Sequence, residues 1–322
     1  MIYLGFDVGG TATKIGILDE NANILAQGST PTGVGNPYPE IIRNMAEYAV
    51  SLLKTLGMTA DDVTASGVGV PGVANTNTGI VMRCVNMDWW NIPFRDEMQK
   101  HIPKPVILGN DADLAGYAES VCGVSKGTDS SVFITLGTGI GGGLIFFGRP
   151  WSGHHSAGGE LGHTIMSIDG IPCTCGRRGC LERYCSTTAL IRIAKETLPR
   201  YPDSALWTVT DHNPDNLNGK NIFRCAMDND PAALDAFDQY IHNLCLALSS
   251  VICLLDPEVI VLGGGLSKDG DFLLGALNRH IRDYLAFPEV PFADIKIATL
   301  GANAGFIGAA MLAKQHMEDD AI

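Results

Sequence analysis

The sequence has few basic residues and no long hydrophobic run. It carries 22 lysines and arginines against 35 aspartates and glutamates, which gives a formal net charge of −13. A chain of this sign gains nothing from counterion release on a nucleic-acid backbone, so we expect no nucleic-acid partner. The longest apolar stretch, Leu244 to Leu255, contains two serines and is shorter than the ~18–20 residues that cross a bilayer. We therefore expect no membrane partner.

An export signal is also missing at the start of the chain. The residues from Met1 to Asp7 contain no basic residue and end in an acid. The sequence has nine cysteines, an odd number, and in a reducing compartment disulfides are rare. We predict a cytoplasmic protein that uses its cysteines for packing or for metal binding.

The length of 322 residues is enough for about two domains, and 46% hydrophobic with 18% charged residues is typical of a globular protein. Alternating apolar and polar residues, short apolar runs and helical spacing predict where strands and helices lie. A strand, a glycine turn and a second strand open the chain and recur over 131–147, which indicates a duplicated α/β unit. Because strands and helices alternate, we predict an α/β fold. The predicted strands include 65–70, 106–108 and 259–262, and the predicted helices include 40–56, 231–255 and one beginning near 304.

Three glycine-rich loops each follow a short apolar strand. Glycine lets the backbone approach a phosphate closely and direct successive N–H groups at it, and threonine or lysine adds donors. Asp7, at the end of the first strand, could hold magnesium directly or through water. Taken singly, such a loop is more often only a turn. The candidate nucleotide-binding residues are Asp7, Gly9, Gly10, Thr11, Lys14, Gly137, Thr138, Gly139, Gly264 and Gly265.

The two major nucleotide-binding fingerprints are absent. No Gly-x-x-x-x-Gly-Lys-Ser/Thr loop occurs. Gly137 to Gly142 has the letters of Gly-x-Gly-x-x-Gly, but a predicted strand follows it where that fingerprint requires a helix. This order excludes a Rossmann dehydrogenase.

A dense group of metal-binding side chains lies in the middle of the chain. His163, Cys173, Cys175 and Cys180 fall within eighteen residues, in a stretch rich in glycine. Three thiolates and one imidazole suit tetrahedral zinc, and four protein ligands make a closed, structural site. Catalytic zinc would need one of the four to be absent from the ligand set. The cysteines could also be ordinary free thiols or form a disulfide. Because three cysteines and one histidine occur within eighteen residues, zinc is favoured over these alternatives.

Carboxylates near these motifs suit acid–base chemistry and recognition of hydroxyl groups. Asp111 follows Asn110 at the end of a predicted strand, where it could accept a proton from a substrate hydroxyl or merely cap a helix. Glu160 and Glu182 lie close in sequence to the zinc ligands, and a zinc-bound His163 would have its other ring nitrogen oriented toward a substrate. These groups together predict a polyol substrate, although Glu182 alone is more often a solvated helix charge.

These motifs, in this order, resemble the ROK family of sugar kinases, and most of all its bacterial glucokinases. The similarity covers nearly the whole chain. It rests on the Asp7 to Lys14 loop, Pro71-Gly72-Val73, Asn110-Asp111-Ala112, Leu136 to Gly143, Gly159-Glu160-Leu161-Gly162-His163 and Cys173 to Glu182.

The resemblance implies a fold, a reaction and a set of residue roles. The fold would be of the actin/hexokinase (ribonuclease H-like) type, two α/β domains with a cleft between them: 1–112 with 304–322, and 113–303 with the zinc knuckle at 163–182. The family uses ATP with magnesium, and Asp111 would be the base that deprotonates the sugar hydroxyl. Many members are dimers or tetramers, so a homo-oligomer is expected. The sugar would be held by Gly72, Asn110, Asp111, Glu160, His163 and Glu182.

The choice of sugar is less well determined than the reaction. Glucose phosphorylated on its 6-hydroxyl is the first hypothesis, and fructose, mannose, allose or N-acetylmannosamine are the alternatives. Asp113, where asparagine is common, and the polar stretch 201–221 depart from the usual glucokinase pattern. Some relatives are sugar-responsive repressors with a helix-turn-helix domain ahead of the kinase-like part. The first glycine loop begins at residue 7 here and the net charge is negative, so the repressor interpretation is disfavoured. A non-catalytic sugar sensor is disfavoured because Asp7, Asp111 and all three glycine loops are present.

Overall fold

The computed structural model describes residues 1–319, which divide by their contacts into two units. Unit 1 contains residues 1–133, 143–159 and the C-terminal segment from Thr299. Unit 2 contains residues 134–142 and 160–298. The two contact units differ from the two predicted domains, because residues 113–133 and 143–159 belong to unit 1 together with residues 1–112. Contacts alone do not define domains, so the predicted domain boundary at residue 112 stays a prediction.

Unit 1 is built on a five-stranded sheet that begins with an antiparallel hairpin. Leu4, Phe6 and Val8 of the first strand point to one face, and Tyr3 points to the other, as the two-residue period of a strand requires. The first strand pairs with the second antiparallel and with the fourth parallel. The strands, in the order β3-β2-β1-β4-β8, are β1 (Ile2–Val8), β2 (Ala12–Asp19), β3 (Ile24–Pro31), β4 (Val63–Val70) and β8 (Val106–Asn110).

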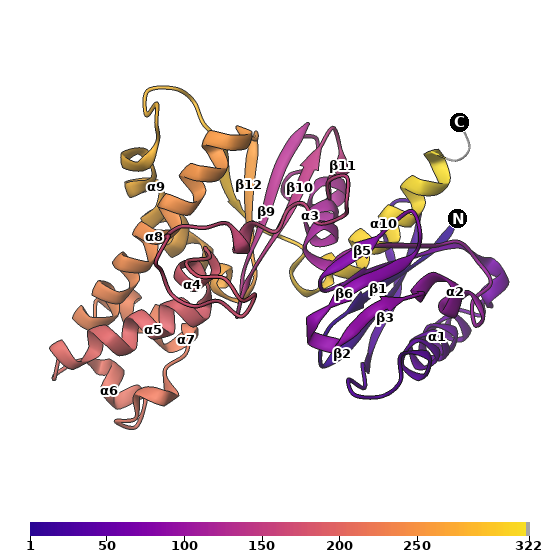
Figure 1. The fold of residues 1–322 in the computed structure, drawn as a ribbon, viewed down its shortest axis with the longest axis horizontal. Coiled ribbons are helices and arrows are strands. Elements are labelled where there is room, and N and C mark those ends of the chain that lie inside the picture. Colours follow the sequence, from indigo (N-terminus) through magenta and orange to yellow (C-terminus); the bar gives the residue numbers. More distant parts are fainter. Residues whose placement is uncertain (320–322) are drawn as a thin grey trace. The chain divides into compact units, whose positions relative to one another are not determined.

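Helices cover both faces of this sheet. On one face, α1 buries Ile41, Ile42 and Met45 against the side chains of β1 and β2. On the other, α3 and α10 pack together, so segments far apart in sequence lie side by side (Figure 1). These apolar faces form the core of the unit. The helices are α1 (Tyr38–Thr55), α2 (Phe94–Gln99), α3 (Asp111–Cys122) and α10 (Ala304–Asp319).

Glycines let α10 lie directly against the backbone of the sheet. A Cβ atom on Gly5 would lie 1.8 Å from the carbonyl oxygen of Phe306, and one on Gly67 would lie 1.7 Å from that of Ala309. No side chain fits in those gaps. The C-terminal helix α10 therefore packs directly on β1, the strand that carries Asp7, and on β4.

A smaller three-stranded sheet leads from the end of β4 to β8. It consists of β5 (Val73–Asn75), β6 (Ile80–Cys84) and β7 (Trp89–Ile92). Arg95, at the start of α2, fixes it by donating to the carbonyl oxygens of Thr76 at 2.6 Å, Asn77 at 2.9 Å and Val106 at 2.9 Å. This sheet anchors the turn at Gly72.

Glu119 joins α3 to the segment that leads into α10. Its side chain is fully buried, and its two oxygens accept from the backbone N–H groups of Val124, Thr299 and Leu300 and from the Thr299 hydroxyl, at 2.8–3.0 Å. A buried carboxylate is tolerated only when donors surround it in this way.

We expect Glu119→Gln to lower the free energy of unfolding by about 2–4 kcal/mol, because the amide places donors against backbone donors. Chemical denaturation measures this loss. Glu47→Gln is the matched control, since Glu47 is 68% exposed and pairs only loosely with Arg43 at 3.8 Å; it should change stability by less than about 0.5 kcal/mol. Equal losses in the two variants would contradict this account of Glu119.

The second sheet repeats the strand order of the first. Its order is β11-β10-β9-β12-β13, and the neighbouring β12 and β13 are parallel, as β4 and β8 are in the first sheet. This confirms the internal repeat predicted from the glycine turns. The strands are β9 (Ser130–Leu136), β10 (Ile140–Phe146), β11 (Arg149–Pro150), β12 (Val259–Gly263) and β13 (Asp294–Ile297), and both units contain residues of β9 and β10.

The helices of unit 2 pack around α8. Phe223, Phe237 and Phe272 form a ring cluster, with centroids 5.1 Å apart for the first pair and 4.6 Å for Phe237 with Phe272. Within residues 1–319, α8 is the one helix whose length and composition would allow a membrane span, but it buries apolar residues along its length as a core helix does. The helices are α4 (Glu182–Cys185), α5 (Thr187–Thr197), α6 (Ala205–Val209), α7 (Gly219–Met227), α8 (Pro231–Leu255) and α9 (Gly270–His280).

The polar stretch 201–221 folds into short helical turns. Asp230, the N-cap of α8, accepts from the Ser204 hydroxyl at 2.8 Å and from the Ala205 N–H at 2.7 Å. Trp207 stacks on His212 with ring centroids 6.4 Å apart. The stretch is thus tied to the start of α8.

Within residues 1–319, short 3-10 turns join several of these elements. They are Ala60–Asp62, Val85–Met87, Leu161–His163 (η3), Leu198–Arg200, Pro214–Asn216, Gly265–Asp269, Ile281–Tyr284 and Gly301–Asn303 (η8).

Candidate active site

The first glycine loop joins β1 to β2 in unit 1. Asp7 and Lys14 face each other across this hairpin, with Nζ 3.7 Å from a carboxylate oxygen. Thr32 braces the loop, since its N–H donates to the Thr11 carbonyl at 3.1 Å and its hydroxyl to the Gly9 carbonyl at 2.6 Å. Gly10 and Thr11 lie exposed at the tip. The loop is therefore held firmly at its base, with its tip open to a ligand.

The Asp7 carboxylate lies at the start of α10. Burial raises its pKa, and the Lys14 ammonium opposes that rise. Lys14 also donates to the Ala302 carbonyl of η8 at 3.0 Å, so the lysine joins the loop to the turn before the helix. A bound divalent cation would favour the charged form of Asp7.

Gly305 leaves the space that the Asp7 carboxylate fills. A Cβ atom there would lie 2.5 Å from Cγ and 2.7 and 2.9 Å from the two carboxylate oxygens. We expect Gly305→Ala to displace the carboxylate and, if Asp7 belongs to the MgATP site predicted from the sequence, to lower kcat/KM for MgATP by about tenfold or more. Gly275→Ala in α9 is the matched control, because its nearest neighbour is the flexible tip of Arg279 at 3.9 Å. Unchanged kinetics in Gly305→Ala would show that the position of Asp7 does not matter.

Asn110 and Asp111 occupy the turn from β8 into α3. The Asn110 side chain caps the helix by accepting from the N–H groups of Ala112 at 2.8 Å and Asp113 at 3.2 Å. Its amide donates to the Gly72 carbonyl at 3.0 Å, and Gly72 has a φ of 109°, which requires glycine. The cap is thus Asn110, and Asp111 is the first residue of the helix, where its carboxylate accepts from the Ala112 N–H at 2.9 Å.

The second and third glycine loops lie together in unit 2. A Cβ atom on Gly264 would lie 2.7 Å from the carbonyl oxygen of Leu136, the residue before the Gly137 loop. Gly264 has a φ of 91°, a conformation that other residues rarely adopt. Thr138 is exposed, and Gly137 and Gly139 are partly buried. The structure thus brings Gly137, Thr138, Gly139, Gly264 and Gly265 to one end of the β9–β12 pair.

The predicted zinc ligands form a compact cluster. Their ligand atoms all lie within 4.8 Å of one another. Cys175 Sγ is 3.6 Å from Cys180 Sγ, and Cys173 Sγ is 3.8 Å from His163 Nδ1. Tetrahedral zinc with Zn–S bonds of about 2.3 Å requires separations of about 3.8 Å between sulfurs. The four side chains therefore fit a closed zinc site, with His163 Nδ1 as the ligand nitrogen.

The electrostatics of the cluster favour metal binding. A hydrogen bond from the Arg177 backbone N–H is the main cause that lowers the pKa of Cys175 to about 6. Burial raises the pKa of Cys180, so a cation is needed to hold that thiolate. The Arg177 guanidinium also donates to the His163 carbonyl at 2.7 Å. Arg177 thus offsets part of the thiolate charge of the cluster.

The remaining predicted sugar-site residues, Glu160 and Glu182, flank the four predicted zinc ligands in sequence. Glu160 is exposed and immediately precedes η3, and its backbone carbonyl accepts from the His163 N–H at 3.0 Å. The Glu182 carboxylate lies 4.0 Å from Cys173 Sγ and accepts from the Ile140 N–H at 3.0 Å. Sequence reasoning missed this second contact, and it also missed the roles of Thr32 and Gly305.

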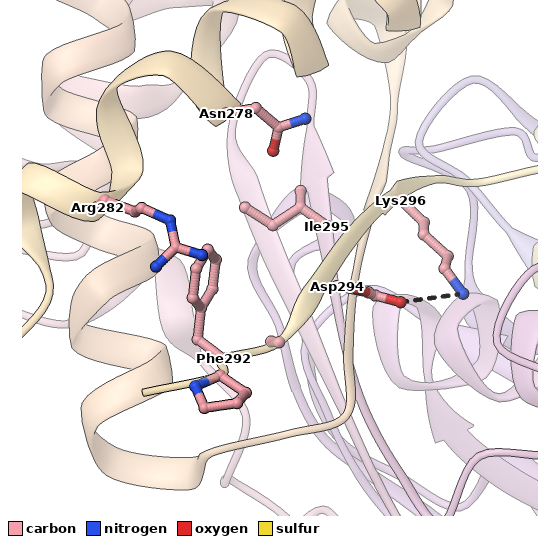
Figure 2. A pocket seen from close by; sticks show the side chains of 8 residues that line it. Asn278, Arg282, Phe292, Asp294, Ile295 and Lys296 are labelled. Carbon is pink, nitrogen blue, oxygen red and sulfur yellow. Dashed lines mark ion pairs between the residues drawn. The ribbon is translucent and has the colours of Figure 1, made fainter. Parts of the chain in front are cut away.

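The predicted site residues divide between the two units. Asp7 to Lys14, Gly72, Asn110 and Asp111 belong to unit 1, and the remaining residues belong to unit 2. A pocket of about 380 Å³ lies elsewhere, beside β13, and none of its lining residues is a predicted site residue. There the Arg282 guanidinium lies over the Phe292 ring at 5.1 Å, and Lys296 pairs with Asp294 at 3.8 Å (Figure 2).

Comparison with known proteins agrees with the motifs and with the fold. The chain is 36% identical over 316 residues to a glucokinase of Halalkalibacterium halodurans, covering 97% of this chain and 95% of the relative. It is 33% identical to the crystal structure of a ROK family glucokinase from Streptomyces griseus in complex with glucose and AMPPNP. The TM-score with that structure is 0.83, and the match covers 98% of this chain and 100% of that chain.

A crystal structure of a ROK family transcriptional regulator, a homolog of the E. coli MLC protein, has a TM-score of 0.86 at 26% identity. It matches 99% of this chain and 78% of that regulator. These structures confirm the predicted α/β fold of the actin/hexokinase type. The ROK family profile itself matches residues 3–316. The chain belongs to the ROK family.

Proposed function

We propose that this chain is a glucokinase that transfers the γ-phosphoryl group of ATP to the 6-hydroxyl of glucose, with Asp111 as the general base. The coarser assignment, an ATP-dependent sugar kinase, follows from its similarity to ROK glucokinases over nearly the whole chain. The observation that carries the finer proposal is the first turn of α3. Asn110 caps that helix and donates to the Gly72 carbonyl, so Asp111 is the first helical residue, directly beside two of the proposed sugar-site residues.

In the proposed reaction Asp111 accepts the proton of the sugar 6-hydroxyl. The hydroxyl oxygen forms a bond to the γ-phosphorus, the bond from that phosphorus to the β–γ bridging oxygen breaks, and ADP leaves. The glycine loops at Gly9-Gly10-Thr11, Gly137-Thr138-Gly139 and Gly264-Gly265 would direct backbone donors at the phosphates, with Lys14 near Asp7. Magnesium, when bound, supplies charge neutralisation at the phosphates, and Asp7 would hold it directly or through water.

The sugar would be held by Gly72, Asn110, Asp111, Glu160, His163 and Glu182. His163 turns Nδ1 toward Cys173, so its Nε2 would be the nitrogen that meets a sugar hydroxyl. In this proposal the zinc is structural: all four ligands come from the chain, and its role is to fix the ring of His163 and the backbone near Glu182.

The test is ADP release from MgATP against a panel of glucose, fructose, mannose, allose and N-acetylmannosamine. We expect glucose to give the highest kcat/KM. A different preferred hexose would keep the kinase assignment and replace the substrate. If a sugar binds and none is turned over, the enzyme proposal is wrong and a sugar-sensing role, favoured by the likeness to the regulator, takes its place.

We further propose that the protein is a cytoplasmic homo-oligomer, a dimer or tetramer, that binds neither nucleic acid nor membrane. Light scattering of the purified chain measures the oligomeric state, and a monomer at micromolar concentration would contradict that part of the proposal.

A further inference from the structure

One carboxylate links the zinc knuckle to the second glycine loop. Glu182 comes two residues after Cys180, the last zinc ligand, and it starts α4. One of its oxygens lies 4.0 Å from Cys173 Sγ, and the other accepts from the Ile140 N–H at 3.0 Å. A Cβ atom on Gly139 would lie 2.3 Å from that second oxygen, so the carboxylate packs directly against the loop backbone.

The residues that follow hold the same loop by its carbonyl groups. The N–H of Thr187 donates to the Gly137 carbonyl at 2.8 Å, and the Thr188 hydroxyl donates to the Thr138 carbonyl at 2.8 Å. The segment from Glu182 to Thr188 thus contacts the loop at three points. Two of these are donors to its carbonyls, and the third is an acceptor for one of its amides.

This arrangement restricts what the loop can offer to a phosphate. The Ile140 N–H is already used by a carboxylate, so phosphate must be bound by other groups of the loop. Their directions depend on how the backbone is held, and a loop fixed in advance binds its ligand with a smaller loss of conformational entropy.

We infer that Glu182 is a positioning residue for the Gly137–Gly142 loop. Through Glu182, the zinc knuckle fixes the loop backbone and so sets the affinity of the loop for nucleotide. This role is additional to the contact with sugar proposed above, and it rests on the proposed binding of nucleotide at this loop. It predicts that changes at Glu182 and Thr188 alter nucleotide affinity even when no sugar is present.

The experiment measures binding of MgAMPPNP to the zinc-loaded protein by calorimetry, without sugar. We expect Glu182→Ala to weaken binding about tenfold, the change that loss of one hydrogen bond to a charged group gives. Glu182→Gln keeps a carbonyl oxygen that can accept from the Ile140 N–H, so its affinity should stay within about threefold of the unchanged protein. The difference between the two variants isolates the hydrogen bond.

Two further variants keep the test independent of the sugar site. Thr188→Val removes the hydroxyl but keeps the shape of the side chain. It should weaken MgAMPPNP about three- to tenfold and leave glucose binding unchanged. Glu196→Ala, on the exposed side of α5 where Glu196 pairs with Arg192, is the control and should change neither affinity.

Hydrogen exchange gives the direct readout. The Ile140 amide should exchange faster in Glu182→Ala than in Glu182→Gln, with zinc content equal in both. If MgAMPPNP affinity and Ile140 exchange are the same in both variants, the inference is wrong while the kinase proposal stands. If the unchanged protein binds no MgAMPPNP, both proposals are wrong.

Discussion

Asp111→Asn is expected to lower kcat by about three orders of magnitude, within the range that a general base contributes. The amide keeps the size of the side chain and can still accept from the Ala112 N–H, but it cannot take the proton of the sugar hydroxyl. Glucose and MgAMPPNP affinities should therefore stay within about threefold of their original values. Steady-state kinetics and calorimetry on the same preparation measure both quantities.

Asp113→Asn is the matched control for this prediction. It makes the same chemical change two residues further along α3. Asp113 is buried and accepts from the Ser152 hydroxyl at 2.6 Å, a bond that an amide oxygen can also accept. We expect its kcat to stay within about tenfold of the original value. Equal losses of kcat in the two variants would mean that Asp111 supports the structure of the helix and does not accept the proton of the sugar hydroxyl.

Loss of zinc is expected to have the second largest effect. Cys180→Ser replaces a fully buried ligand of the cluster, and the remaining thiolates would be left without the cation that holds them together. We expect zinc content to fall below one ion per chain and the free energy of unfolding to fall by about 4 kcal/mol or more. Glucose affinity should fall as well, because His163 and Glu182 lose their support.

The control for zinc loss is Cys225→Ser, which changes another buried cysteine of unit 2 that lies outside the cluster. It should destabilise the fold modestly while keeping zinc and glucose affinity. Metal analysis, denaturation and glucose calorimetry give the three readouts. A Cys180→Ser protein that keeps its stability and its glucose affinity would show that the cluster has no structural role.

The parts of the fold that sequence predicts are those whose signal is local. The strand, glycine turn and strand at the start of the chain become β1 and β2, and the same pattern near the middle becomes β9 and β10. The long apolar segment at 231–255 is α8, with the predicted bounds. The four predicted zinc ligands are close in sequence, so their spacing alone predicts that they cluster.

The parts that sequence does not predict depend on contacts between distant segments. Glu119 accepts from residues about 180 positions away, and nothing near it in sequence marks it as a link to α10. Gly305 matters because the Asp7 carboxylate fills the space beside it. The helical turns at 201–221 are too short to give a periodic signal, so the stretch reads only as polar.

The most direct test of the central claim is the product formed from MgATP and glucose labelled with carbon-13 at C6. The account predicts that carbon-13 NMR shows coupling of C6 to phosphorus, that ADP forms in equal amount, and that both form about a thousandfold more slowly in Asp111→Asn. Glucose that binds and is recovered unchanged, or that carries its phosphate on another carbon, would contradict it.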